Sequence, residues 1–149
     1  MGPHLVFSCL AFHELSPEQL YELLALRAAV FVVEQHCPYL DPDGKDQAAR
    51  HLLGYVEKEL AAYARLLPEP DGRAAIGRVV VQPEFRGRGW GRDLMQQAIA
   101  KAGADFNAHT IRISAQCYLI EFYQSLGFAT RGEPYLEDDI PHIRMERAG

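Results

Sequence analysis

The chain has 149 residues, 48% of them hydrophobic, a length and composition suited to one globular domain over residues 1–149. A net charge of −5 argues against a general affinity for nucleic acid or for an anionic membrane. The three cysteines are far apart and match neither a disulfide framework nor a CxxC motif, which favours a reducing compartment. Because no signal peptide and no apolar run of membrane-spanning length is evident, we expect a cytoplasmic protein.

The beginning of the chain predicts a strand followed by a helix. Residues 5–12 mix β-branched and aromatic residues, as strands do. Ser16 and Gln19 form a capping box, and Pro17 occupies the first helical position, so a helix should begin there. This helix should end before Pro38.

After this first helix the pattern predicts strands that alternate with two further helices. Residues 75–81 are almost continuously apolar, as is typical of a strand buried on both faces. A helix over residues 91–102 should stop at Gly103, and a second one that contains Tyr123 should close at Gly127. The order predicts a mixed α/β (α+β) domain with antiparallel strands first and a βαβ unit in its second half. The expected strands lie at 52–56, 60–67, 75–81, 111–116, 128–131 and 140–145, and the expected loops at 37–50, 68–73 and 132–139.

A glycine-rich loop joins the strand at 75–81 to the helix after it. Glycines allow the chain to turn back, and free N–H groups at a helix N-terminus attract a pyrophosphate. A P-loop would need Gly-Lys-Ser/Thr, and a dinucleotide fingerprint fails at Arg92. The loop therefore predicts an anion site of another kind; the alternative is a surface turn whose arginines serve solubility. Its residues are Arg86, Gly87, Arg88, Gly89, Trp90 and Gly91.

The same region resembles the GNAT acetyltransferase superfamily. Arg86-x-x-Gly89-x-Gly91 looks like its acetyl-CoA signature, and the segment 122–128, Phe-Tyr-x-x-Leu-Gly-Phe, is similar to its second motif. Segments within 26–46 and 137–142 look like the ElaA group of that superfamily. The resemblance implies the GNAT acyl-CoA N-acyltransferase fold, a mixed, mostly antiparallel central sheet flanked by helices.

The resemblance also implies a site for acetyl-CoA. The strand at Val79 and Val81 would separate from the strand that ends at Gln116, where the superfamily more often has Asn, and the pantetheine arm would lie in the opening. Backbone groups of Val79 and Val81 would hold this arm, and the Val81 amide would stabilise the oxyanion. Residues 86–91 would cradle the pyrophosphate. Tyr123 would protonate the leaving thiolate; its helical spacing alone would fit a core aromatic equally well.

The general base is not evident, because the strand at 75–81 carries no carboxylate. Glu34 lies at the C-terminal end of a helix, where a carboxylate is unfavourable to the helix dipole, which suggests another reason for its presence. His51 and His142 are further candidates for a proton relay, since histidine titrates near neutral pH, although each could be structural.

Two acidic runs, 41–46 and 137–139, could border the acceptor and suit a cationic amine, or could be solvated loops. The second run reads Asp138-Asp139 where the ElaA pattern usually has Asp-Gly. No spacing of residues suggests a metal site, and Cys117 has no evident histidine partner.

We therefore expect direct transfer of an acetyl group from acetyl-CoA to a primary amine, on a small molecule or a peptide, without a metal or a covalent acyl-enzyme. The alternative is a non-catalytic domain that binds or senses acetyl-CoA. Apolar strand edges would also be compatible with a homodimer.

Overall fold

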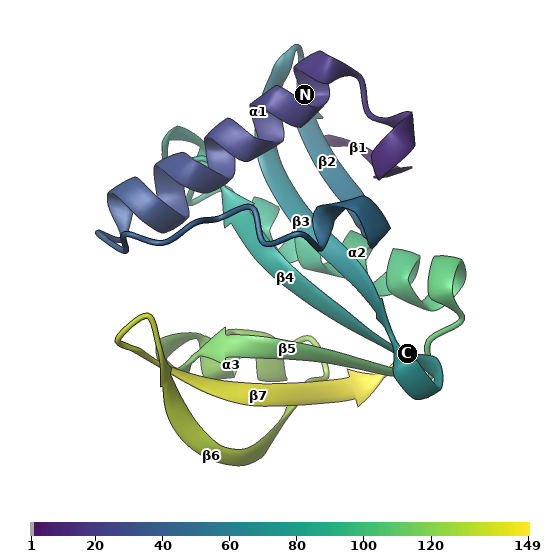
Figure 1. Ribbon diagram of the computed structural model, residues 1–149, viewed down its shortest axis with the longest axis vertical. Coiled ribbons are helices and arrows are strands. Elements are labelled where there is room, and N and C mark those ends of the chain that lie inside the picture. Colours follow the sequence, from purple (N-terminus) through teal and green to yellow (C-terminus); the bar gives the residue numbers. More distant parts are fainter. Residues whose placement is uncertain (1) are drawn as a thin grey trace.

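This computed structural model describes residues 2–149, which form a seven-stranded sheet with helices on both faces (Figure 1). The strand order is β1-β2-β3-β4-β5-β7-β6, and every neighbouring pair is antiparallel except β4 and β5. The expected mixed, mostly antiparallel sheet is confirmed. The strands are β1 (Val6–Ala11), β2 (Arg50–Val56), β3 (Glu59–Glu69), β4 (Arg73–Val81), β5 (Thr110–Gln116), β6 (Ala129–Glu137) and β7 (Ile140–Ala148), and the α-helices are α1 (Pro17–Arg27), α2 (Trp90–Phe106) and α3 (Ile120–Gln124).

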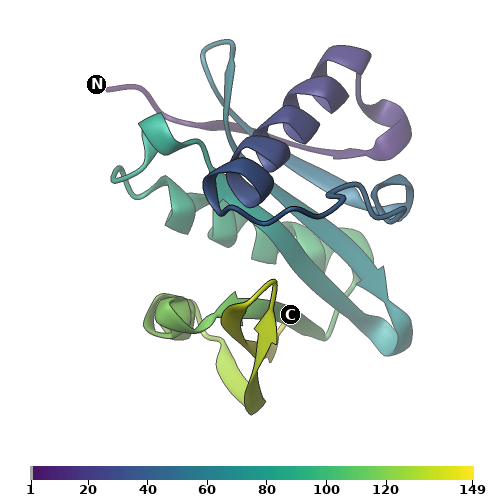
Figure 2. The ribbon, with the colours of Figure 1, turned by 60° about the vertical axis from the view of Figure 1, so that its left-hand side comes forward.

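The helices divide the hydrophobic core into two parts, with α1 on one face of the sheet and α2 on the other (Figure 2). Leu52 and Leu53 are neighbours on β2, and both are fully buried. Because successive side chains of a strand point to opposite faces, Leu52 packs in the core beneath α2, whereas Leu53 packs beneath α1. In the part of the chain that the structure describes, no helix is long and apolar enough to cross a membrane.

The first helix begins at the predicted capping box and then widens. The Ser16 hydroxyl accepts a hydrogen bond from the Gln19 amide at 3.1 Å, and the Gln19 side chain accepts one from the Ser16 amide at 2.9 Å. From Ala28 to Glu34 the helix continues as the π-helical segment η2. Its end carries i→i+5 hydrogen bonds, such as Gln35 N–H to the Val30 carbonyl at 3.1 Å. The helical segment ends before Pro38, as expected, but it is not one uniform α-helix.

Several boundaries in the second half differ from the sequence prediction; β7, for example, continues to Ala148 and does not end at 145. Gly103 does not stop α2, which continues to Phe106 because Phe106 still packs against the core; Asn107, with φ of 50°, supplies the left-handed end. The stretch 132–139 is not a loop, because β6 extends to Glu137 through an irregularity between Arg131 and Tyr135. All residues of β6 are exposed, so they lack the apolar alternation that reveals a half-buried strand.

A bulge interrupts β4 beside the centre of the sheet. Tyr63 on β3 pairs with Val80, and Arg65 pairs with Gly77, so β4 has one residue more than β3 over this interval. Arg78 lies within the bulge and adopts a φ of 50°, in the left-handed region. A bulge bends its strand and redirects the peptide groups that follow.

Beyond a short paired segment, β4 and β5 separate. Only residues 73–75 of β4 pair with residues 110–112 of β5, although both strands continue for several residues. The two strands and α2 form the expected βαβ unit, and the sheet opens at its centre toward the C-terminal ends of this parallel pair (Figure 1).

The turn between β6 and β7 keeps the geometry of a tight hairpin without a glycine. Glu137 pairs with Ile140, and the two residues between them, Asp138 and Asp139, have φ of 52° and 62°. Two consecutive positive φ values define a type I′ turn, whose second position favours glycine. The aspartate at this position therefore keeps the turn but adds strain.

We predict that Asp139→Gly stabilises the protein by ~1 kcal/mol, because glycine adopts a positive φ without steric cost. Thermal unfolding should then show a melting temperature about 2–4 °C higher. Asp105→Gly is the matched control, since Asp105 is an exposed aspartate inside α2 and the same replacement there should lower the melting temperature. A lower melting temperature for Asp139→Gly would contradict this interpretation of the turn.

Candidate active site

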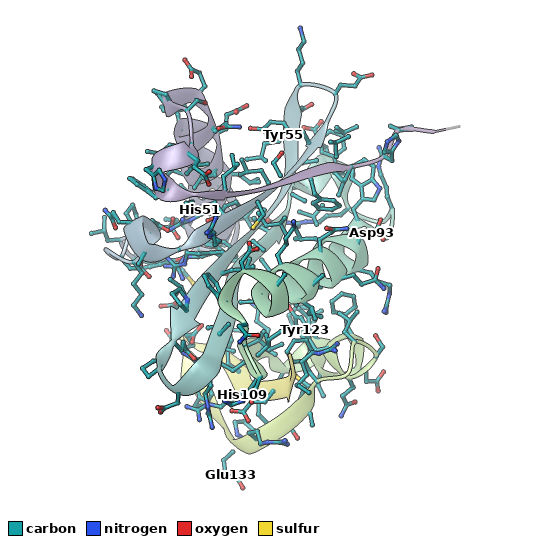
Figure 3. The ribbon with its side chains drawn as sticks, turned by 90° about the vertical axis from the view of Figure 1, so that its right-hand side faces the viewer. His51, Tyr55, Asp93, His109, Tyr123 and Glu133 are labelled. Atoms are coloured by element: carbon teal, nitrogen blue, oxygen red, sulfur yellow. The ribbon has the colours of Figure 1, made fainter. Side chains whose placement is uncertain are left out.

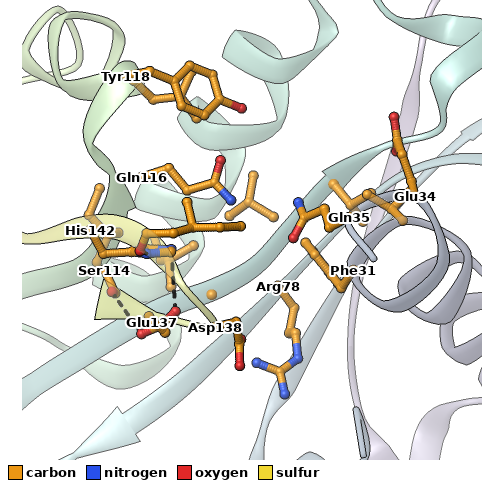
Figure 4. Close-up of a pocket in the computed structure, with 18 of the residues that line it drawn as sticks. Phe31, Glu34, Gln35, Arg78, Ser114, Gln116, Tyr118, Glu137, Asp138 and His142 are labelled. Atoms are coloured by element: carbon orange, nitrogen blue, oxygen red, sulfur yellow. Dashed lines mark hydrogen bonds and ion pairs between the residues drawn. The ribbon is translucent and has the colours of Figure 1, made fainter. Parts of the chain in front are cut away.

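A cleft of about 810 Å³ lies where β4 and β5 separate (Figure 4). One wall comes from the end of η2 and from β4, and the opposite wall comes from β5, α3 and the β6–β7 hairpin. The cleft therefore joins segments that are far apart in the sequence. Polar and aromatic groups in its lining include Glu34, Gln35, Tyr39, Arg78, Arg86, Ser114, Gln116, Tyr118, Tyr123, Glu137, Asp138 and His142.

The peptide groups of Val81 face this cleft. The Gln82 amide donates to the Ala61 carbonyl of β3 at 2.8 Å, so alternation along the strand turns the preceding residue away from β3. In agreement, Arg86 Nε donates to the Val81 carbonyl at 3.0 Å from the cleft side. Val79 lines the same wall. The structure thus places both valines of the predicted site at the opening.

The glycine loop lies between β4 and the N-terminus of α2. Gly87 and Gly89 have φ of 83° and 78°, and a Cβ at either position would meet nothing within 4 Å. These glycines are required for the backbone conformation, and the space above them is open. The Trp90 side chain is buried against Phe85, with ring centroids 5.7 Å apart, so it anchors the loop from below.

Two arginines near this loop have no carboxylate partner among residues 2–149. The Arg88 guanidinium lies over the rings of Phe85 and Trp90, at 5.5 and 5.3 Å from their centroids. Arg92 lies 5.3 Å over the Phe122 ring and donates to Ser125 Oγ at 2.8 Å. Their positive charges add to that of the helix N-terminus, which favours an anion here.

Glu34 and Arg86, both predicted site residues, bind each other. Arg86 Nη1 and Nη2 donate to the two Glu34 carboxylate oxygens at 2.8 and 2.9 Å. The hydrogen bonds from Arg86 hold the pKa of Glu34 below its ordinary value, so this carboxylate is a weaker proton acceptor than an unpaired one. The residues are 52 positions apart, and no local pattern in the sequence could have revealed the pair.

Tyr123 lies between α2 and the C-terminal strands and is 8% exposed (Figure 3). Its ring contacts Phe122 and Phe128 edge to face, with centroids 5.1 and 6.0 Å apart. No residue of the described chain hydrogen-bonds its hydroxyl, although the residue lines the cleft. Burial, together with the neighbouring Tyr118, raises the pKa of Tyr123 to about 12. The hydroxyl is therefore a protonated donor at neutral pH.

His142 lies on β7 directly opposite Gln116 of β5 and is almost fully buried. Its Nδ1 is 2.7 Å from the Ile140 carbonyl, which can only accept, so Nδ1 carries the hydrogen and Nε2 is the free nitrogen of the neutral ring. Nε2 is 3.4 Å from a carboxylate oxygen of Glu137, and Glu137 also accepts from Ser114 Oγ at 3.2 Å (Figure 4). Sequence reasoning identified His142 but not this contact, which arises only when β5, β6 and β7 align.

Two aspartates of the acidic run 41–46 are buried, and these two neither belong to a solvated loop nor line the cleft. Asp41 and Asp46 are 4% and 6% exposed, and both bind Arg27, which is fully buried, at 2.8 and 2.7 Å. Asp46 also binds Arg65 at 3.0 Å, and Asp41 binds Arg78 at 2.8 Å. Both interpretations of the run, a border of the acceptor site and a solvated loop, are therefore wrong for these two residues. The sequence could not reveal this, because their arginine partners come from α1, β3 and β4.

His51 belongs to the same buried region and does not reach the cleft. Its ring nitrogens lie 2.6 Å from the Tyr63 hydroxyl and 2.9 Å from the Asp46 carbonyl, and burial lowers its pKa. Of the two alternatives for His51, these contacts fit the structural one and not a proton relay at the cleft. Among the residues described, no group of three or more His, Cys, Asp or Glu is arranged to hold a metal ion.

Comparison with known proteins defines the class. Residues 13–148 match the family model of the acetyltransferase (GNAT) domain, and the chain belongs to this family, whose general activity is acyl transfer. Protein ElaA of Escherichia coli (strain K12) is 47% identical over 138 residues, which cover 90% of each chain. The crystal structure of Escherichia coli ElaA has a TM-score of 0.90 at 44% identity, covering 96% of this chain and 99% of that one. The expected ElaA-like membership is confirmed.

Other solved structures share the fold. An acyl-CoA N-acyltransferase from Pseudomonas aeruginosa has a TM-score of 0.92 at 42% identity, covering 97% of this chain and 99% of that one. A GNAT family acetyltransferase from Elizabethkingia anophelis, described with acetyl-CoA bound, has a TM-score of 0.68 at 16% identity and covers 97% and 98%.

Proposed function

We propose that this protein transfers the acetyl group of acetyl-CoA to a primary amine by direct attack of the amine on the thioester. One observation carries the proposal: the opening between β4 and β5 brings a backbone donor at Val81 and a hydroxyl at Tyr123 into one cleft. The glycine loop adjoins this cleft at Arg86. The thioester of acetyl-CoA, the hydroxyl that would protonate its leaving thiolate and the amine acceptor can therefore meet in one place.

Acetyl-CoA would bind across the opening between β4 and β5. Amides at the N-terminus of α2, with Arg88 and Arg92 beside them, would hold the pyrophosphate. The pantetheine arm would lie along the backbone of Val79 and Val81, and Gln116 on β5 would face it from the other wall. The acetyl-CoA bound to the related fold from Elizabethkingia anophelis supports this choice of donor.

We predict that Gly89→Asp weakens acetyl-CoA binding by at least about tenfold, or ~1.4 kcal/mol, because it places a carboxylate where the phosphates would lie. Isothermal titration measures this directly, with coenzyme A, NAD and ATP as comparison ligands. Gly132→Asp is the matched control, since Gly132 on β6 also has a positive φ, 73°, and open space around it. If wild-type protein binds no acetyl-CoA, or binds ATP or NAD more tightly, the proposed donor is wrong.

The acyl transfer itself needs few protein groups. The amine nitrogen bonds to the thioester carbon, the carbonyl oxygen becomes negative, and the Val81 N–H would stabilise it. When the carbon–sulfur bond breaks, the electron pair leaves on sulfur. The Tyr123 hydroxyl would donate its proton to that sulfur, because it is protonated at neutral pH and has no other partner in the described chain.

We predict that Tyr123→Phe lowers kcat for acetyl transfer by about 100-fold at pH 7–9. Because Phe keeps the ring contacts with Phe122 and Phe128, the free energy of unfolding should change by less than ~1 kcal/mol. Steady-state kinetics with acetyl-CoA and a panel of amines, together with thermal unfolding, test both statements. Binding of acetyl-CoA without turnover of any amine in the wild type would instead favour a sensor domain.

The amine must lose a proton before or during attack, and His142 is better placed than Glu34 to accept it. Glu34 is held by two hydrogen bonds from Arg86. His142 presents Nε2 toward Glu137, whose negative charge would stabilise the imidazolium that forms. With Asp138, Glu137 also gives this end of the cleft a negative character that suits an ammonium acceptor.

We predict that His142→Gln lowers kcat/KM for the amine by about 100-fold at pH 7, and that this loss shrinks as the pH approaches ~10, where an alkylamine is already neutral. The pH profiles of wild type and variant provide the measurement. His13→Gln, a replacement at an exposed histidine in the turn after β1, should leave the profile unchanged. A loss that stays constant with pH would argue against His142 as the base.

A further inference from the structure

The bulge in β4 places a left-handed backbone conformation on an arginine. Arg78 has φ of 50°, a region that disfavours every residue with a Cβ. Gly77, immediately before it, would accept such a conformation freely, yet its φ is not positive. The chain thus keeps an unfavourable residue at the strained position, although a glycine stands beside it. This arrangement implies that the Arg78 side chain contributes something that glycine could not.

The Arg78 side chain is bound at two atoms to one buried residue. Its Nε donates to Asp41 Oδ1 at 2.8 Å, and its Nη2 donates to the Asp41 backbone carbonyl at 3.0 Å. The guanidinium also lies 5.8 Å over the Tyr39 ring. A planar guanidinium held at two points has little freedom, so the backbone that carries it is fixed relative to Asp41.

Asp41 is itself held on the opposite side. Its Oδ2 accepts from Arg27 Nε at 2.8 Å, and Arg27 is fully buried at the end of α1. Arg27 also donates to Asp46 at 2.7 Å. A continuous chain of charge-assisted hydrogen bonds therefore runs from α1 through Asp41 and Arg78 to the bulge.

The bulge precedes the backbone groups that the transfer reaction would use. Val79 directly follows Arg78, and the Val81 peptide groups face the cleft. We propose that Asp41 is a positioning residue: through Arg78 it holds the bulge in its left-handed conformation and so fixes the Val79 and Val81 amides toward the acyl group. This inference rests on the proposed function. Displacements of ~1 Å in such a site can cost about 100-fold in rate.

The contact of the Arg78 side chain with Asp41 is called the tether below. Two replacements at Arg78 test the tether and the backbone conformation separately. Arg78→Ala removes the side chain but keeps a Cβ at positive φ, so kcat should fall by about 10- to 100-fold. Arg78→Gly also removes the tether, but glycine adopts this φ freely and should recover most of the lost rate. Hydrogen–deuterium exchange of residues 76–82 should be faster in Arg78→Ala than in wild type.

A second pair separates positioning from stability. Asp41→Asn and Asp46→Asn each weaken a buried contact with Arg27, but only Asp41 binds Arg78. Both variants should melt at lower temperature. At a temperature where both are folded, only Asp41→Asn should lower kcat and accelerate exchange in β4.

Two results would overturn the proposal. One is an Arg78→Ala variant with wild-type kcat and exchange, which would mean that the bulge needs no tether. The other is an Arg78→Gly variant as slow as Arg78→Ala, which would mean that the guanidinium itself acts on substrate. If wild-type protein transfers no acetyl group, the proposed function fails, and the exchange of residues 76–82 still decides whether the tether holds the bulge.

Discussion

The separation of β4 from β5 is the constraint on which the rest of the site depends. Continued pairing would have used the backbone groups of both strands and closed the centre of the sheet. Instead, β4 is held by β3 and α2 and β5 by β7, so the opening has support on both sides. Backbone groups that turn into an opening need another partner, either water or a ligand. The cleft is therefore polar along a wall of otherwise apolar strands, and this polarity makes it suitable for an extended ligand with amides of its own.

The network around Arg27 determines how the chain covers the α1 side of this opening. Three arginines, Arg27, Arg65 and Arg78, face Asp41, Asp43 and Asp46, so the charges of the network balance; Arg27, Arg65, Asp41 and Asp46 are its buried members. Buried charges are costly unless they are paired with good geometry. Each arginine comes from a different element, whereas the aspartates share one short segment. The segment after η2 is thus fixed to the sheet by directional contacts, although it contains little regular structure.

Local sequence patterns predicted the elements that neighbouring residues determine. They did not predict the features that depend on residues far apart in the sequence. The start of α1 and the strand–loop–helix–strand unit follow from capping and periodicity within a few residues. The predicted end of α2 at Gly103 was wrong, because packing of Phe106 extends the helix. The buried state of Asp41 could not be predicted, because its partners lie on other elements. For the site, the resemblance pointed to several residues that line one cleft and to others, residues 87–91, that lie outside its lining. The pairing of Glu34 with Arg86 needed the folded chain.

The two ends of the cleft differ in charge, and the difference suits the proposed reaction. Arg88, Arg92 and the N-terminus of α2 lie outside the lining and give the surroundings of the cleft next to Arg86 a positive character, whereas Glu137 and Asp138 line the opposite wall and make it negative. An anionic acyl carrier and a cationic amine would therefore each find a complementary end, and neither would favour the other's place. The two residues proposed for proton transfer, Tyr123 and His142, also differ from each other. Burial keeps Tyr123 protonated, so its hydroxyl can donate, whereas His142 Nε2 lies 3.4 Å from the Glu137 carboxylate. A proton taken from the amine and a proton given to sulfur would then pass through different residues, and exchange with solvent would return a proton to Tyr123 and remove one from His142 before the next turnover.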